Sequence, residues 1–156
     1  LGKGVTPKEE YPHHYLHDIN GVNLVADLGK RLKLPSTWIK SGKVTSKEHM
    51  RAGKFYEMRL GKKADFIEKI SKTIIGLEGL QMIVNADKLS RVSKGKYEEK
   101  KEKINFADVA KKCIEQVNGK YVIEKYGMRQ GDNLGQLIRK ERIEWLKKYE
   151  SKHTEN

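Results

Sequence analysis

The sequence predicts an α+β fold, with helices around a β-hairpin in the N-terminal part and a mostly helical C-terminal lobe. Three observations lead to this prediction. Apolar residues recur at helical spacing before residue 34 and again after residue 64. After Gly42 the apolar period shortens to about two, which is typical of strands. The charged stretch KGKYEEKKEK at 94–103 then separates a second set of helical patterns.

The N-terminal elements follow in order from these patterns. Residues 1–18 hold two prolines and no clear period, so we expect an irregular arm. Asn23 is a suitable N-cap for a helix that ends near Lys33. Pro35 suits the first turn of a short second helix, which we expect to run through Ser41 and to stop at Gly42.

A hairpin and a broken helix are expected next. Val44 and the alternating stretch FYEMRL predict two strands around a long polar loop. From residue 62 an apolar helical stripe runs to about residue 90. Gly76 and Gly79 each weaken a helix by roughly 1 kcal/mol relative to alanine, so we expect a break or bend there.

The C-terminal lobe is predicted to contain two amphipathic helices that flank a short strand. Asn105 is a suitable cap for the first helix, and Asn118 with Gly119 stops it. YVIEKY reads as the strand, and the last helix should run from about Asn133 to Tyr149. The predicted organisation is an arm at 1–18, a module at 19–93, a charged linker at 94–103 and the helical lobe at 104–156. That lobe is also our candidate for homo-oligomer contact.

The chain is strongly basic, with a formal net charge of +12 over 156 residues. Residues 28–63 contain eleven lysines and arginines against two acids, so they hold +9 of that charge in under a quarter of the chain. A surface that is basic only for solubility would interleave acids, as residues 94–103 do. The concentration of positive charge favours a polyanionic partner such as nucleic acid.

The expected order of helix, turn, short helix and hairpin is that of a winged helix-turn-helix, in which one helix enters a duplex groove beside a basic wing. The segments VADLGKRLKLPSTWIKSGKV and GKFYEMRLGKKADFIEKI resemble the winged-helix module of excisionases and the MerR superfamily. The resemblance covers about residues 19–70. The region between Pro35 and Gly42 is two or three residues shorter than the family usually has, which weakens base reading by this helix.

This arrangement predicts a double-stranded DNA-binding protein that is not an enzyme, either a transcriptional regulator or a recombination accessory factor of a mobile element. Trp38 is expected to be a core anchor under the hairpin rather than a base-stacking platform, and Tyr56 is likewise expected to pack rather than to contact nucleic acid. The predicted DNA-binding residues lie on the short helix, the turn and the wing: Ser36, Thr37, Lys40, Lys43, Lys47, Arg51 and Lys54.

Two alternatives use other features of the chain. An RNA-binding or ribosome-associated protein would need the same charge, with exposed aromatic rings to stack on unpaired bases. A small metal-dependent nuclease would use carboxylates such as Asp65 and Glu68, one helical turn apart, with Lys69 or Lys72 beside them. This second spacing is common by chance.

Other site classes have weak support in the sequence. His13, His14, His17 and Asp18 offer ligands, but a zinc site is not predicted without cysteine pairs or helical support. The one cysteine, Cys113, lies on an apolar stripe, and no cofactor-binding motif appears. No apolar run is long enough to span a membrane, and no secretion signal opens the chain, so a cytoplasmic or nuclear location is expected. Leu1 in place of methionine suggests a fragment of a longer chain.

Overall fold

A computed structural model describes residues 2–90, 92–93, 96–97, 105–127 and 133–154. This part of the chain is almost entirely helical, and its only strands are a two-residue antiparallel pair in which Val92 lies opposite Tyr97. The predicted α+β fold is therefore wrong, and the fold is all-α. The elements are η1 (Gly2–Val5), η2 (Lys8–Glu10), α1 (His17–Arg31), α2 (Ser36–Gly53), η3 (Phe55–Glu57), α3 (Leu60–Ser71), α4 (Gly76–Ser90), β1 (Val92–Ser93), β2 (Lys96–Tyr97), α5 (Ala107–Gln116), α6 (Gly119–Tyr126) and α7 (Leu134–Thr154).

The chain folds into two compact units. Unit 1 comprises Leu1–Lys54 and Thr73–Ile104, and unit 2 comprises Phe55–Lys72 and Asn105–Asn156. Unit 1 contains α1, α2 and α4, whereas unit 2 contains α3, α5, α6 and α7. The division predicted from the sequence stays a prediction, and most of its linker at 94–103 lies outside the described residues.

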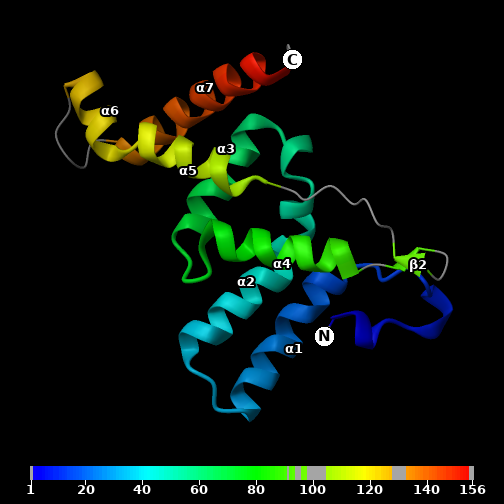
Figure 1. The fold of residues 1–156 in the computed structure, drawn as a ribbon. Coiled ribbons are helices and arrows are strands. Elements are labelled where there is room, and N and C mark those ends of the chain that lie inside the picture. The colour runs from blue at the N-terminus through cyan, green and yellow to red at the C-terminus, as the bar shows by residue number, and fades with distance from the viewer. Residues whose placement is uncertain (1, 91, 94–95, 98–104, 128–132, 155–156) are drawn as a thin grey trace. The chain divides into compact units, whose positions relative to one another are not determined.

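Helices α1 and α2 lie side by side and antiparallel in unit 1 (Figure 1). The turn between them uses a left-handed Lys33, with φ of 52°, and Pro35 precedes the first residue of α2. The sequence predicted that this helix would stop at Gly42. In the structure Gly42 instead lies in the interior of α2. A Cβ at Gly42 would come within 2.8 Å of Val25 Cγ1, so the glycine permits close helix packing rather than a turn.

The predicted wing is absent from the described residues between 19 and 70. Instead, α2 continues for 18 residues to Gly53, and Phe55–Glu57 forms a 3-10 turn. The continuation has a packing reason, because Glu48 and Ala52 are fully buried one turn apart on the same side of the helix. A wing needs two strands, so the winged-helix prediction is wrong.

Three phenylalanines form the centre of unit 2. Phe55, Phe66 and Phe106 are 1% exposed or less, and their ring centroids lie 5.4 to 5.9 Å apart. Lys63 is buried beside them, 2% exposed, with its ammonium 5.6 Å from the Phe55 ring centroid. Its Nζ donates to the carbonyl oxygen of Tyr56 at 3.0 Å and forms an ion pair with Glu150. The buried charge is therefore both paired and hydrogen-bonded.

Helices α3 and α4 are separated where the sequence predicted a break. Helix α3 ends at Ser71, and α4 begins at Gly76 in a left-handed conformation with φ of 63°, which glycine adopts at little cost. The amide of Gly76 donates to Thr73 Oγ1 at 3.3 Å. The predicted interruption near Gly76 is confirmed.

The predicted strand YVIEKY is helix α6. Helix α5 ends at Gln116, just before the stop predicted at Asn118. Asn118 instead caps the next helix, because its side chain accepts a hydrogen bond from the amide of Tyr121 at 3.0 Å. Gly127 ends α6 in a left-handed conformation with φ of 62°. Only Val122 is buried in α6, so the short apolar run resembles a strand although one face alone packs inward.

A buried carboxylate joins α6 to α7. Glu141 is 7% exposed and accepts hydrogen bonds from Lys125 Nζ at 2.6 Å, Tyr126 Oη at 2.7 Å and Tyr121 Oη at 3.2 Å. The hydrogen bonds from Lys125 and Tyr126 hold the pKa of Glu141 below its usual range. Because the same carboxylate favours the charged amine, the pKa of Lys125 is raised.

This arrangement predicts acid sensitivity in unit 2. The lowered pKa of Glu141 contributes stability above the ordinary glutamate pKa of about 4.3, and this contribution is lost as pH falls through the lower folded value. We expect Glu141→Gln to be less stable than the unmodified chain at pH 7 and to lose less further stability on acidification. Urea unfolding at pH 7 and pH 3 measures both effects. Glu144→Gln, an exposed change on the same helix, should retain the original pH dependence.

Candidate nucleic-acid interface

The predicted binding residues gather on one helix rather than on a short helix and a wing. Ser36 through Arg51 all belong to α2, and Lys54 is its C-cap residue. Five of the cations, which we call the α2 stripe, recur at intervals of three and four residues, and all are exposed. They are Lys40, Lys43, Lys47, Arg51 and Lys54.

The spacing places the α2 stripe along one face of the helix. Ser36 precedes Lys40 by one turn and shares that face, whereas Thr37 lies about 100° to its side. The opposite side of α2 packs inward through Glu48 and Ala52. The helix is therefore fixed by its buried side while its cations project into solvent.

One member of the α2 stripe is also part of the fold. Arg51 NH1 donates to Glu48 Oε2 at 3.0 Å, and the Glu48 side chain is 0% exposed. Arg51 thus compensates a buried carboxylate, which leaves it less available to a ligand than its neighbours. Lys43 and Lys47 make no ion pair with a described residue, so they are the sharper probes of ligand binding.

Of the two aromatic residues that were expected to pack, Tyr56 does so, with its ring edge-on to Phe55 at a centroid distance of 5.4 Å, whereas Trp38 does not. Trp38 is 63% exposed near the beginning of α2 and is not a core anchor, because the hairpin that it was expected to support does not exist. Tyr56 is 54% exposed, and its hydroxyl donates to the carbonyl oxygen of Asn105. Burial raises the pKa of the Tyr56 hydroxyl further above its usual range.

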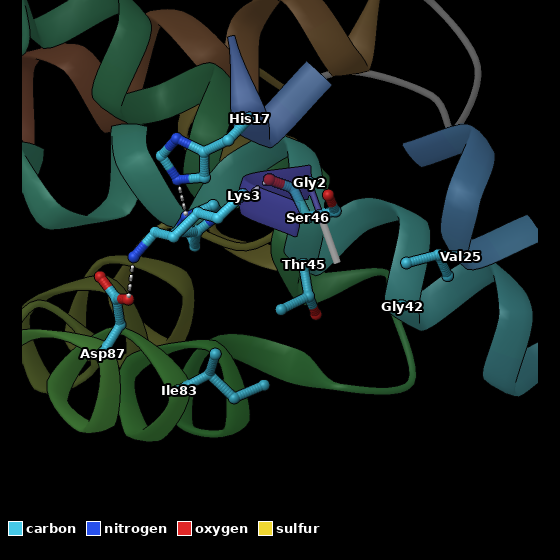
Figure 2. A pocket seen from close by; sticks show the side chains of 10 residues that line it. Gly2, Lys3, His17, Val25, Gly42, Thr45, Ser46, Ile83 and Asp87 are labelled. Atoms are coloured by element: carbon cyan, nitrogen blue, oxygen red, sulfur yellow. Dashed lines mark hydrogen bonds and ion pairs between the residues drawn. The ribbon is translucent and has the colours of Figure 1, made fainter. Parts of the chain in front are cut away.

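The histidine cluster of the arm does not converge on one point. His13 stacks on Tyr15, and His14 Nδ1 lies 3.0 Å from Thr6 Oγ1. His17 instead meets a residue that sequence spacing gave no reason to select, with its Nε2 3.2 Å from His49 Nε2 on α2. Both histidines line a pocket of about 380 Å³ formed by α1, α2, α4 and η1 of unit 1. Figure 2 shows His17 in this pocket, together with the ion pair of Lys3 with Asp87.

The tautomers of the His17–His49 pair follow from its other contacts. His17 Nδ1 lies 2.6 Å from the carbonyl oxygen of His14, and His49 Nδ1 lies 2.7 Å from that of Ser46. Each Nδ1 therefore donates a hydrogen to a carbonyl oxygen, and the two Nε2 atoms face each other within hydrogen-bond distance. Zinc needs three or four ligands, and the described residues contain no group of three potential ligands.

The carboxylates of the nuclease alternative are held by α7. Arg139 forms a bidentate ion pair with Asp65, in which Nε donates to Oδ1 at 2.6 Å and Nη2 donates to Oδ2 at 3.2 Å. Glu68 pairs with both Arg142 and Lys72. Burial opposes the charged form of Glu68, but hydrogen bonds from Lys72 and Arg142 still hold its pKa below the usual range. The two carboxylates thus fix α3 against α7 and do not form an open pair for metal binding.

The one cysteine is also structural. Cys113 is 0% exposed on α5, and burial raises the pKa of its thiol to about 11. At neutral pH such a thiol is protonated and unreactive. No helix in the described part of the chain is long and apolar enough to cross a membrane.

The fold and the α2 stripe define a class: a basic, all-α protein with an exposed cationic helix. No protein-family model matches the chain, and no solved structure matches it. Among curated proteins it is similar over 98% of its length, at 23% identity, to the multifunctional CCA protein of Ectopseudomonas mendocina. The proteins of that name from Pseudomonas fluorescens (24% identity over 96% of the chain) and Janthinobacterium sp. (35% over 44%) are similar as well.

The chain spans only part of these relatives: 37% of the Ectopseudomonas mendocina protein, 36% of the Pseudomonas fluorescens protein and 17% of the Janthinobacterium protein. Their shared name corrects three predictions from the sequence. It overturns the double-stranded DNA partner, the role in transcription regulation or recombination, and the expectation of a protein that is not an enzyme. It favours the RNA-binding alternative, and the all-α fold independently removes the winged helix.

Proposed function

We propose that this chain is an RNA-binding helical region of a CCA-type tRNA nucleotidyltransferase, an enzyme that acts at the 3′ end of tRNA. The observation that carries the proposal is the similarity to multifunctional CCA proteins over 96 to 98% of the chain. In this proposal the described helices hold the tRNA. The bond-forming step belongs to the whole enzyme, of which the chain spans little more than a third of the length of these two relatives.

The α2 stripe is the proposed tRNA contact. Its cations lie along a single helix face, where they can neutralise successive phosphates and release the counterions condensed on the RNA. Such contacts fix position and orientation but carry no sequence information. This is suitable for an enzyme that must accept many tRNAs, because their backbone shape is shared while their base sequences differ.

Competition binding tests the proposal. The chain is titrated with labelled tRNA, and unlabelled tRNA, a ribosomal RNA hairpin and duplex DNA of matched charge compete at the same salt concentration. We expect tRNA to compete at least tenfold better than the DNA. Equal or tighter binding of the duplex DNA would remove the proposal, and preference for the ribosomal hairpin would replace tRNA by a ribosomal partner.

A further inference from the structure

Helix α7 carries a ladder of three parallel aromatic rings in unit 2. Trp145 and Tyr149 have ring centroids 5.1 Å apart and planes inclined by 18°, and Tyr149 and His153 follow at 4.1 Å and 19°. The residues recur every fourth position, so the rings stack along one side of the helix. None of the three is buried. Trp145 and Tyr149 are half-buried and His153 is exposed, so the packing of unit 2 leaves part of this aromatic surface open to solvent.

Two lysines lie on the same side of the helix as this ring ladder. Lys148 and Lys152 each follow a ring by three residues, and both are exposed. Neither makes an ion pair with a described residue. Aromatic rings that alternate with unpaired cations are the combination by which proteins bind unpaired nucleotides, since rings stack on bases and cations contact phosphates.

A pocket of about 370 Å³ adjoins the first ring of the ladder, within the size range of small-ligand sites. Trp145 Nε1 donates to Gln116 Oε1 at 2.6 Å, which fixes the indole and leaves the amide NH2 of Gln116 as a donor. Glu141 is already satisfied by three donors from α6. The pocket is lined by Gln116, Val117, Tyr121, Lys125, Glu141, Glu144, Trp145 and Lys148.

We propose that this face of unit 2 binds unpaired RNA nucleotides. One base enters the pocket beside Trp145 and accepts a hydrogen bond from the Gln116 amide, while the adjoining phosphates lie on Lys148 and Lys152. The inference rests on the proposed RNA-binding function, but it concerns a surface separate from the α2 stripe. The α2 stripe holds the tRNA backbone, and the ring ladder holds single-stranded nucleotides.

Tryptophan fluorescence tests the inference directly. The chain has two tryptophans, so Trp38→Phe leaves Trp145 as the reporter. In this background we expect an unstructured RNA octamer to quench the emission of Trp145, because a stacked base lies against the indole. Tyr149→Leu and the pair Lys148→Glu with Lys152→Glu should each weaken octamer binding by about tenfold. Tyr15→Leu, which removes an exposed ring of unit 1, should leave it unchanged.

The controls separate this inference from the proposed function. Lys43→Glu with Lys47→Glu should weaken tRNA binding but retain the quenching by the octamer. Absence of quenching while tRNA still binds overturns the ring-ladder site alone, whereas loss of binding to every RNA overturns the proposed function as well. The inference is also overturned if inorganic polyphosphate or duplex RNA competes as well as the octamer, because negative charge alone would then be enough for binding. His153→Ala, at the exposed end of α7, tests the ladder with less risk to folding, and circular dichroism verifies each variant.

Discussion

Reversing two charges of the α2 stripe, Lys43→Glu with Lys47→Glu, is expected to lower the affinity for tRNA by at least tenfold. Both side chains are exposed and face the same side of α2, so each substitution replaces an attraction to phosphate by a repulsion. If each lysine neutralises one phosphate, the slope of log affinity against log salt becomes less negative by roughly 1.8, since each contact contributes about 0.9. Filter binding at four salt concentrations measures the affinity and the slope together.

The matched control is a double variant that changes the net charge of the chain by the same amount, at two lysines outside the α2 stripe. Lys112→Glu with Lys140→Glu alters two exposed lysines of unit 2, on α5 and α7. A nonspecific effect of net charge would lower tRNA affinity equally in both double variants. That result, or an unchanged salt slope in the α2 variant, would show that the stripe is not the tRNA contact.

The largest expected loss of stability follows from Phe106→Ala. The Phe106 ring is 0% exposed and packs against both Phe55 and Phe66, with centroid distances of 5.4 and 5.6 Å. Removing it deletes two aromatic contacts and leaves a cavity in the centre of unit 2. Substitutions of this kind cost about 3–5 kcal/mol, which is a large fraction of the stability of a typical domain.

Urea unfolding monitored through Trp145 isolates the effect on unit 2, provided that Trp38→Phe is present as the background. Lys112→Ala, an exposed change on α5, should alter the free energy of unfolding by no more than about 0.5 kcal/mol. A Phe106→Ala variant that is destabilised by less than about 1 kcal/mol would contradict the packing described for the three rings.

The basic segment could be located from the sequence, but its architecture could not. Counting charges selected the lysines of residues 28–63, and the structure places the central ones on a single helix. The error began at Gly42, where a glycine between two apolar patterns indicated a turn. Its actual role is to let α1 approach α2, and this role depends on Val25, a residue 17 positions away. Local propensity contains no information on such a tertiary contact.

Longer-range partners explain the other failures. The end of α5 near Asn118 was predicted correctly, but Asn118 also caps α6, which lies where a strand was expected. His49 and Glu141 have no motif around them, since their partners come from other helices and are brought together only by folding. Trp38 was assigned to a core beneath a hairpin, so its placement failed together with the hairpin.

The length of α2 has a consequence for the shape of the partner. Lys40 and Lys54 are 14 residues apart, which corresponds to about 21 Å along a helix axis. Because one continuous helix carries these cations, the spacing between their backbone positions is fixed. A stiff, base-paired arm of RNA presents phosphates at fixed intervals that can match the fixed spacing of the cations. A flexible strand would lose conformational entropy on adopting the same spacing.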